Sequence, residues 1–210
     1  MRIKAVFLDI GGALLTDGWG HPARVRAAEA FGLDFDVMDS RHRAAFETYE
    51  LGKLTLADYL DLVVFTQKRA FSHDQFREFM TAQSQAFPEM IDLVRQLKAR
   101  HGLKTAVVSN EARELNAYRI ETFDLTSFVD FFVSSCFVHM RKPDADMFRL
   151  ALDLAQTPAG QVAYVDDRQM FVEIAEALGI HGVHHTDYAS TRAKLAALGL
   201  DCPDGRKEPS

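Results

Sequence analysis

The most informative stretch of this chain is Ile3-Lys4-Ala5-Val6-Phe7-Leu8-Asp9-Ile10-Gly11-Gly12-Ala13-Leu14-Leu15-Thr16. Its first six residues form an apolar run of the kind that is typical of a buried strand. The run ends at the carboxylate of Asp9, and a glycine turn follows. A carboxylate at the C-terminal end of a buried strand is well placed to act as a nucleophile or as a metal ligand.

Four other short apolar runs have the same strand pattern and lie at residues 103–108, 131–133, 162–165 and 182–184. Between them, apolar residues recur at helical spacing in residues 90–101, 144–155 and 172–178. Strands that alternate with helices predict an α/β fold, in which a Rossmann-like parallel sheet is covered by helices on both faces.

Residues 19–86 interrupt this alternation, because they show helical patterns and no convincing strand. We expect a small helical cap here, inserted into a core formed by residues 1–18 and 87–200. Breaks are expected near Gly32, Gly52 and Ser72. The tail, residues 201–210, is polar and is expected to be disordered. The expected core of the cap consists of Phe46, Tyr49, Leu54, Tyr59, Leu60, Val63, Phe76 and Phe79.

The composition narrows the class of protein and its partners. The 210 residues are 48% hydrophobic and 26% charged, as in ordinary soluble domains, and the net charge is −6. This acidic balance argues against nucleic acid or an anionic membrane as the partner. No apolar run approaches the roughly 20 residues that span a bilayer, and no signal peptide is expected. The two cysteines are far apart in the sequence, which indicates a reducing, cytoplasmic location. We expect the protein to be a monomer or a dimer.

Polar groups follow the predicted strands at four places: Asp9, Ser109-Asn110, the Arg141-Lys142-Pro143 loop and Asp166-Asp167. The C-terminal ends of parallel strands line one crevice, so we expect these groups to meet. Three carboxylates make an oxygen site suited to Mg²⁺. Ser109 and Asn110 can cradle an anion, and Lys142 provides a positive charge for a phosphate oxygen. The set therefore predicts phosphoryl transfer from a small phosphorylated metabolite to Asp9, followed by hydrolysis.

The chain resembles the haloacid dehalogenase superfamily, and in particular its phosphatases with a helical cap. The resemblance covers about residues 3–183. It rests on four motifs in order and on a cap loop at residues 49–55. The motifs are Val6-Phe7-Leu8-Asp9-Ile10-Gly11-Gly12, Val107-Val108-Ser109-Asn110, Arg141-Lys142-Pro143-Asp144 and Tyr164-Val165-Asp166-Asp167-Arg168.

The resemblance implies a role for each of the matched residues. Asp9 is the expected nucleophile and a Mg²⁺ ligand, and Gly11 is expected to give its backbone carbonyl to the metal. Asp167 is the expected direct metal ligand, with Asp166 in the outer shell. The expected contacts of the substrate phosphate come from Ser109, Asn110 and Lys142, the last of which also holds Asp9.

The chain departs from the family pattern at Gly11, where relatives carry an acid/base Asp. General acid–base help is worth roughly 10²–10⁴-fold, so a good leaving group is favoured, such as a sugar 1-phosphate or an acyl phosphate. Among its relatives the chain looks most like the subgroup with a DxG opening, which includes a sugar-1-phosphate phosphatase. Asp17 is a possible proton donor, although Asp17-Gly18 is more simply a turn.

Other positions carry weaker expectations. Phe171 and Met140 stand where relatives often have Asn and Gly. Residues expected at the rim or in the passage between core and cap are Glu111, His139, Arg168, Trp19 and His21. His184 and His185 are adjacent on a strand, so they point to opposite faces and are not expected to share a metal.

Three other readings compete with the phosphatase. A catalytically impaired relative would bind Mg²⁺ and a phosphorylated ligand without turnover. A 2-haloacid dehalogenase would use Asp9 on carbon, but it has less use for the acidic pair. A receiver domain would be shorter, would have no helical insertion, and would place its acidic pair near the first strand.

Overall fold

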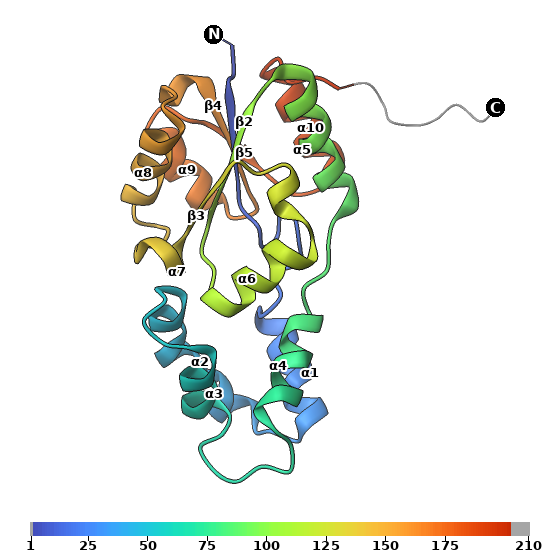
Figure 1. Ribbon diagram of the computed structural model, residues 1–210, viewed down its shortest axis with the longest axis vertical. Coiled ribbons are helices and arrows are strands. Elements are labelled where there is room, and N and C mark those ends of the chain that lie inside the picture. Colours follow the sequence, from blue (N-terminus) through green and yellow to red (C-terminus); the bar gives the residue numbers. More distant parts are fainter. Residues whose placement is uncertain (1, 203–210) are drawn as a thin grey trace, which may run out of the picture.

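The structure is a computed structural model that describes residues 2–202. Within that range the chain forms a five-stranded sheet with helices on both faces (Figure 1). The strands pair in the order β3-β2-β1-β4-β5, and every pairing is parallel. The predicted fold class is therefore confirmed. The strands are β1 (Ala5–Leu8), β2 (Lys104–Ser109), β3 (Phe131–Ser134), β4 (Val162–Asp166) and β5 (His181–His184).

Strand β1 lies at the centre of the sheet, which fits its sequence because all four of its residues are apolar and buried. Its last residue, Leu8, pairs with Val107 of β2 and Val165 of β4. Asp9, the next residue, therefore lies between the C-terminal ends of β2 and β4. This register brings Ser109 and Asp166 to the same edge of the sheet.

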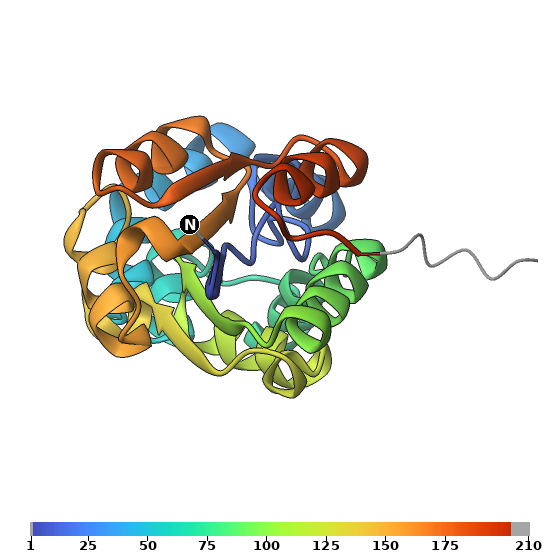
Figure 2. The same ribbon diagram turned by 90° about the horizontal axis from the view of Figure 1, so that it is seen from above.

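Alternate residues of β1 face two different apolar layers. Val6 and Leu8 belong to the cluster packed under α5 and α10, whereas Ala5 and Phe7 pack against α8 and α9. Figure 2 shows these two helical layers on either side of the sheet. The core helices are α5 (Pro88–His101), α6 (Arg113–Thr122), α7 (Ser135–Val138), α8 (Asp146–Ala155), α9 (Gln169–Ala177) and α10 (Tyr188–Ala197), with 3₁₀ turns η1 (Leu125–Ser127) and η2 (Ala159–Gln161).

The expected helical insertion follows β1 and lies beyond the C-terminal edge of the sheet (Figure 1). Side-chain caps begin three of its helices: Asp34, then the capping boxes of Thr55 with Asp58 and of Ser72 with Gln75. We call residues 21–82 the helical insert. The boundaries of the cap at residues 19 and 86 remain a prediction. Its helices are α1 (His21–Phe31), α2 (Phe35–Glu50), α3 (Leu56–Val63) and α4 (His73–Ala82).

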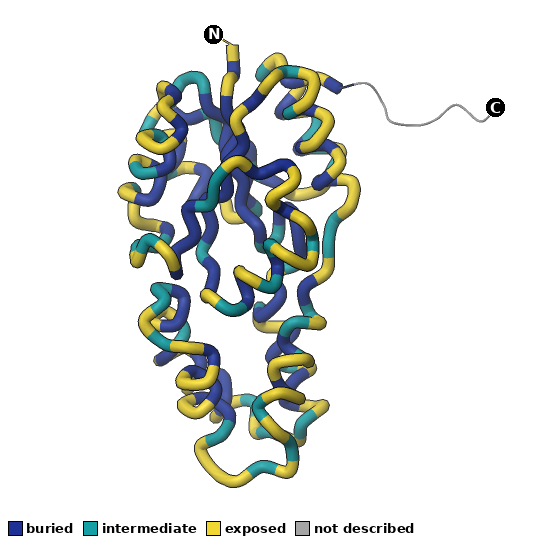
Figure 3. Tube along the Cα trace, viewed as in Figure 1, coloured by how far each residue is buried: buried dark blue, intermediate teal, exposed yellow. Residues whose placement is uncertain are grey.

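The helical insert has an apolar cluster that matches the predicted set and also takes in Trp19, Ala112 and Leu115 from outside it. Tyr49, Tyr59, Leu60, Val63 and Phe76 are buried, and Phe46, Leu54 and Phe79 pack against them. Figure 3 shows this buried interior as separate from the buried sheet. The rings of Tyr49 and Tyr59 stack with centroids 4.6 Å apart.

Polar contacts within this insert are also buried. Trp19 Nε1 donates to the Tyr59 hydroxyl at 2.8 Å, and His42 Nδ1 lies 2.7 Å from the same oxygen. Burial, together with the nearby Arg24 charge, lowers the pKa of His42 to about 4, so its ring is neutral at pH 7. The Tyr59 hydroxyl thus accepts from Trp19 and shares a second hydrogen bond with the neutral His42 ring.

At the other end of the chain, Asp201 and Cys202 are placed by contacts with the core. His101 Nε2 lies 2.8 Å from the Asp201 carbonyl oxygen, and Cys202 is buried in the cluster under α5 and α10. The rest of the tail that is expected to be disordered, residues 203–210, lies outside the described residues. Among residues 2–202, every helix is too short or too polar to cross a bilayer.

The substitution Tyr59→Phe tests the polar part of the insert's core. Removing the hydroxyl leaves Trp19 Nε1 and His42 Nδ1 buried without their partner, so we expect a loss of about 1–3 kcal/mol in the free energy of unfolding. Urea denaturation would measure it. The control is Tyr188→Phe, on the half-buried first residue of α10, with little expected effect. Equal losses in both variants would contradict this account.

Candidate active site

Asp9 and Lys142 form the centre of the candidate site. Lys142 Nζ donates to Asp9 Oδ1 at 2.9 Å, to Asp166 Oδ2 at 2.7 Å and to the Tyr164 hydroxyl at 2.9 Å. The Lys142 side chain is 1% exposed and that of Asp9 is 10% exposed. The ammonium therefore joins the residue after β1 to the end of β4 in a dry environment, where its charge is strongly felt.

The two carboxylates around Lys142 set the protonation of the centre. Burial lowers the pKa of Lys142, but Asp9 and Asp166 outweigh it and raise that pKa above its usual value. Burial raises the pKa of Asp9, the Lys142 charge lowers it and Asp166 raises it, so that the net shift is upward. Lys142 thus stays charged and offsets part of the cost of a buried anionic nucleophile.

Asp9, Asp166 and Asp167 form an acidic cluster, with one oxygen of each within 4.8 Å of the others. Asp166 is already engaged, because Oδ2 accepts from Lys142 and Tyr164 and Oδ1 accepts from Arg168 N at 2.7 Å. Asp167 Oδ1, by contrast, is buried and makes no hydrogen bond to any described residue. Such a group suits a divalent cation with oxygen ligands.

The surroundings of Asp167 also suit a cation. Burial, followed by the charges of Asp9 and Asp166, raises the pKa of Asp167 to about 6. A Cβ atom on Gly12 would overlap the Asp167 carboxylate, so the glycine turn is needed for this close approach. The donor set and its unpartnered oxygen therefore fit Mg²⁺.

Ser109 and Asn110 lie beside this centre, at the end of β2. The Ser109 hydroxyl lowers the pKa of Asp9 through a hydrogen bond. The Asn110 amide holds the backbone of Lys142 at both its N–H and its carbonyl, at 2.8 and 2.9 Å. This contact positions the lysine. The structure thus brings the predicted site residues together at one edge of the sheet, and Gly11, the seventh of them, lines the cavity there.

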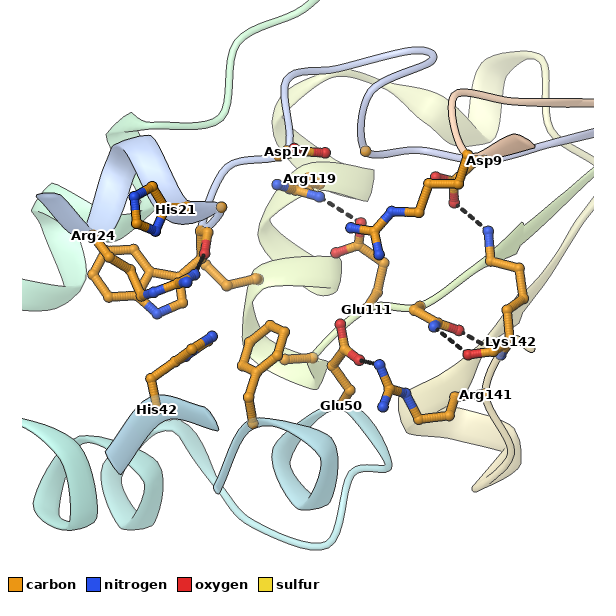
Figure 4. A pocket seen from close by; sticks show the side chains of 18 of the residues that line it. Asp9, Asp17, His21, Arg24, His42, Glu50, Glu111, Arg119, Arg141 and Lys142 are labelled. Carbon is orange, nitrogen blue, oxygen red and sulfur yellow. Dashed lines mark hydrogen bonds and ion pairs between the residues drawn. The ribbon is translucent and has the colours of Figure 1, made fainter. Parts of the chain in front are cut away.

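The cavity in front of Asp9 lies between the sheet and the helical insert and has a volume of about 470 Å³. Ligand sites for small molecules have about 300–1,000 Å³, so a metabolite fits. Figure 4 shows its side chains converging from both sides. The insert and the residue Trp19 before it contribute aromatic and polar groups to the lining, namely Trp19, His21, Arg24, His42, Phe46 and Glu50.

Glu50, the last residue of α2, lines the cavity and connects the insert to the core. Its Oε2 lies 2.6 Å from Arg141 Nη2, across the cavity mouth (Figure 4). Burial raises the pKa of Glu50, while Arg141 lowers it. Next to this pair, the Ser135 hydroxyl donates to the Glu50 carbonyl at 2.7 Å and His139 Nδ1 lies 2.7 Å from Leu51 O. The predicted loop, residues 49–55, provides these contacts.

Glu111 is not the rim residue that the sequence predicts. It is 5% exposed, lines the cavity and forms a buried ion pair with Arg119 of α6. Burial raises the pKa of Glu111 to about 7, although Arg119 lowers it. The sequence gives no signal for this pair, because Glu111 precedes the helix and meets a side chain more than two turns along it.

Other residues that the sequence analysis singles out lie at the edge of the site or outside it. His139 and Arg168 are exposed beside the site, as expected of rim residues. The Phe171 ring lies 4.9 Å from Lys142 Nζ, so this departure from the family pattern gives the ammonium an aromatic face. His184 and His185 contact different partners, Asp167 O and Thr191 Oγ1, and share no site.

Comparisons with known proteins agree with this geometry. The family model for haloacid dehalogenase-like hydrolase matches residues 3–181. The chain is 24% identical over 193 residues to the putative pyrophosphatase PpaX of Caldanaerobacter subterraneus, covering 87% of this chain and 81% of that protein. It is 31% identical over 110 residues to the sesquiterpene phosphatase AstK of Aspergillus oryzae, covering 52% and 55%.

A third relative, acyl-CoA dehydrogenase family member 10 of Mus musculus, is 31% identical over 97 residues, which are 46% of this chain and 9% of that protein. The chain thus covers only 9% and 55% of the lengths of the Mus musculus and Aspergillus oryzae relatives.

Solved structures show the same fold. A HAD family enzyme from Bacteroides thetaiotaomicron, in complex with magnesium, aligns with a TM-score of 0.75 at 19% identity, covering 88% of this chain and 94% of that one. An L-2-haloacid dehalogenase aligns with a TM-score of 0.63 at 18% identity, covering 86% and 85%. Since the family model covers most of the chain and its fold agrees, this protein belongs to the haloacid dehalogenase-like hydrolases.

Proposed function

We propose that this hydrolase is a Mg²⁺-dependent phosphatase, which cleaves a small phosphorylated metabolite through a phosphorylated Asp9. The observation that carries the proposal is the position of the Asp9 carboxylate. It contacts the Lys142 ammonium on one side and belongs to the acidic cluster, in which Asp167 Oδ1 has no partner. Attack by one anion on another needs compensating positive charge on both sides. The two relatives named as phosphatases also support it.

The proposed Mg²⁺ site uses Asp9, the Gly11 carbonyl and Asp167 as direct ligands. Asp166 serves in the outer shell, since Lys142, Tyr164 and Arg168 already occupy its oxygens. When bound, the metal supplies positive charge for the transferring phosphoryl oxygens. Glu111 and Glu50 lie elsewhere on the cavity wall and are paired with arginines, so they are not needed as ligands.

The other residues orient the reactants. Lys142 holds Asp9 Oδ1 and meets a phosphoryl oxygen, while Ser109 and Asn110 bind the phosphate at the end of β2. An oxygen of Asp9 attacks phosphorus and the bond to the leaving group breaks. Water then attacks the same phosphorus and releases the Asp9 carboxylate.

We further propose that residues 19–86 act as a cap that chooses the substrate and excludes water. The support is that one side of the cavity comes from this segment and that Glu50 pairs with Arg141 of the core. Closure over a reactive centre strengthens its electrostatic interactions, because the local dielectric falls.

Two other functions remain as outcomes of the test. Fold similarity to a 2-haloacid dehalogenase is present, but attack on carbon gives no reason for a buried acidic cluster with an unpartnered oxygen. A catalytically impaired protein that binds Mg²⁺ and a phosphorylated ligand would share the whole site and lack only turnover.

The substitution Asp9→Asn tests the nucleophile. Phosphate release from a panel of phosphorylated metabolites should require Mg²⁺, stop with EDTA and be abolished in Asp9→Asn, because an amide cannot accept the phosphoryl group. The control is Arg149→Gln, in an exposed ion pair on α8, with activity unchanged. Halide release that resists EDTA would favour the dehalogenase, and ligand binding without phosphate release the impaired protein.

The raised carboxylate pKa values predict how Mg²⁺ stabilises the fold. The pKa of Asp167 rises from 3.8 to about 6 on folding, so the stability of metal-free protein should fall as the pH rises through this interval. Mg²⁺ relieves that cost only where the carboxylates are ionised. At 100 times Kd it adds about 2.7 kcal/mol.

Thermal unfolding with Mg²⁺ or EDTA would measure this effect at about pH 5 and about pH 8. Each kcal/mol corresponds to roughly 2–4 °C for a chain of this size. The shift should be large at the higher pH, small at the lower pH, and absent in Asp167→Asn. Equal shifts at both values, or a full shift in Asp167→Asn, would contradict the assigned metal site.

A further inference from the structure

The space above Gly11 is bounded by two charged side chains. A Cβ atom on Gly11 would lie 3.5 Å from Asp17 Oδ1 and 3.9 Å from Arg119 Nη1. Gly11, Asp17 and Arg119 all line the cavity that contains Asp9 (Figure 4). Where a residue two positions after the nucleophile would present a side chain, this protein instead presents a guanidinium from α6.

Arg119 is fixed in that place by contacts on three sides. Nη1 pairs with Glu111, Nε donates to Ser84 Oγ at 3.0 Å and Nη2 donates to Thr16 O at 3.3 Å. A guanidinium has five N–H donors, so two remain for a ligand after these three contacts. Since Arg119 is 3% exposed, those donors act in a water-poor wall.

The turn after β1 is shaped around this arginine. A Cβ atom on Gly18 would overlap Arg119 Nη2, and Gly18 adopts a φ of +63° that favours glycine. Gly18 therefore leaves room for the Arg119 guanidinium, whereas a Cβ atom on Gly11 would only be in ordinary van der Waals contact with it. The Arg119 guanidinium and the Asp17 carboxylate thus border the open space at position 11.

The chemistry of this group differs from that of a carboxylic acid. Arginine is not deprotonated in proteins, so Arg119 can stabilise a negative oxygen and cannot protonate one. Among the other cations of the lining, Lys142 is engaged by Asp9, Arg141 by Glu50 and Arg24 by Asp39, whereas Arg168 is exposed and lies over the Phe171 ring. A leaving group that is held by Arg119 alone therefore departs as an anion that is stable without a proton.

We propose that Arg119 binds the departing oxygen of the substrate, and that the substrates are acyl phosphates or phosphoanhydrides, whose leaving groups are stable anions. This inference rests on the proposed phosphatase function. In the first step a bond forms between Asp9 and phosphorus, and the phosphorus–oxygen bond to the leaving group breaks. The leaving group keeps the electron pair and departs as a carboxylate or phosphate.

No proton is needed from the protein in either step. Water then attacks the phosphorus of phospho-Asp9, the bond to Asp9 breaks, and its electron pair restores the Asp9 carboxylate. Both protons of the water remain on the product, dihydrogen phosphate. The reaction thus balances without an acid or base at position 11.

The first test compares leaving groups in the whole protein with Mg²⁺. Acetyl phosphate and inorganic pyrophosphate should be hydrolysed at least about 10²-fold more efficiently, as kcat/KM, than glycerol 3-phosphate, whose alkoxide leaving group needs a proton donor. The ratio of kcat/KM for acetyl phosphate to that for pyrophosphate then shows whether the enzyme prefers acyl phosphates or phosphoanhydrides. Equal efficiency on glycerol 3-phosphate would overturn the inference and favour Asp17 as a proton donor.

The second test removes the guanidinium without leaving a buried unpaired carboxylate, in the double variant Arg119→Met with Glu111→Gln. Across a series of substituted phenyl phosphates, its kcat/KM should fall more steeply with the pKa of the leaving phenol. The loss should reach about 10²–10³-fold for phenyl phosphate. An equal loss for every substrate would mean that Arg119 is structural only, and would overturn the inference.

Two further variants complete the design. Gly11→Asp places a carboxylate beside Arg119 and should raise activity on glycerol 3-phosphate relative to acetyl phosphate, whereas Arg149→Gln should leave the leaving-group dependence unchanged. A retained Mg²⁺-dependent thermal shift would show that the double variant is folded with an intact metal site. If wild type releases no phosphate from any substrate, the proposed function itself fails, and this inference fails with it.

Discussion

The ammonium of Lys142 is the interaction on which the rest of the site depends. It is buried, and it contacts Asp9 after β1 and both Tyr164 and Asp166 on β4, while Asn110 after β2 holds its backbone. Breaking a buried ion pair by removing one partner is costly, about 3–5 kcal/mol, because the other charge stays behind. One side chain therefore ties together segments far apart in the sequence and sets the position of the nucleophile.

Charge compensation around the cavity is nearly complete within the chain. Asp9 and Asp166 share Lys142, Glu50 pairs with Arg141 and Glu111 pairs with Arg119. Within the acidic cluster, Asp167 differs from Asp9 and Asp166, since its buried Oδ1 has no hydrogen-bond partner among the described residues. A metal thus suits the acidic cluster, and the guanidinium groups of Arg119 and Arg141 are held by carboxylates elsewhere in the cavity lining.

The sequence predicts the strands, the helical insertion and the convergence of Asp9, Ser109, Lys142 and the acidic pair. These follow from local apolar patterns and from the rule that parallel strands end at one edge. The pairing of Glu111 with Arg119 could not be predicted, because it depends on how α6 packs against the turn after β1. Likewise, Gly11 reads from the sequence as a missing group, and only the folded chain shows Arg119 beside it.

The contacts between α2 and the core have a consequence for access to Asp9. Ser135 donates to the Glu50 carbonyl, His139 meets Leu51 O and Arg141 pairs with Glu50. Water can replace each of these partners when they separate, so each neutral contact contributes only about 0.5–1.5 kcal/mol net and the charged pair about 1.5–3 kcal/mol. The contacts between α2 and the core beside Asp9 are thus polar and can exchange with water, while the apolar contact of the insert with the core is made elsewhere, by Ala112 and Leu115.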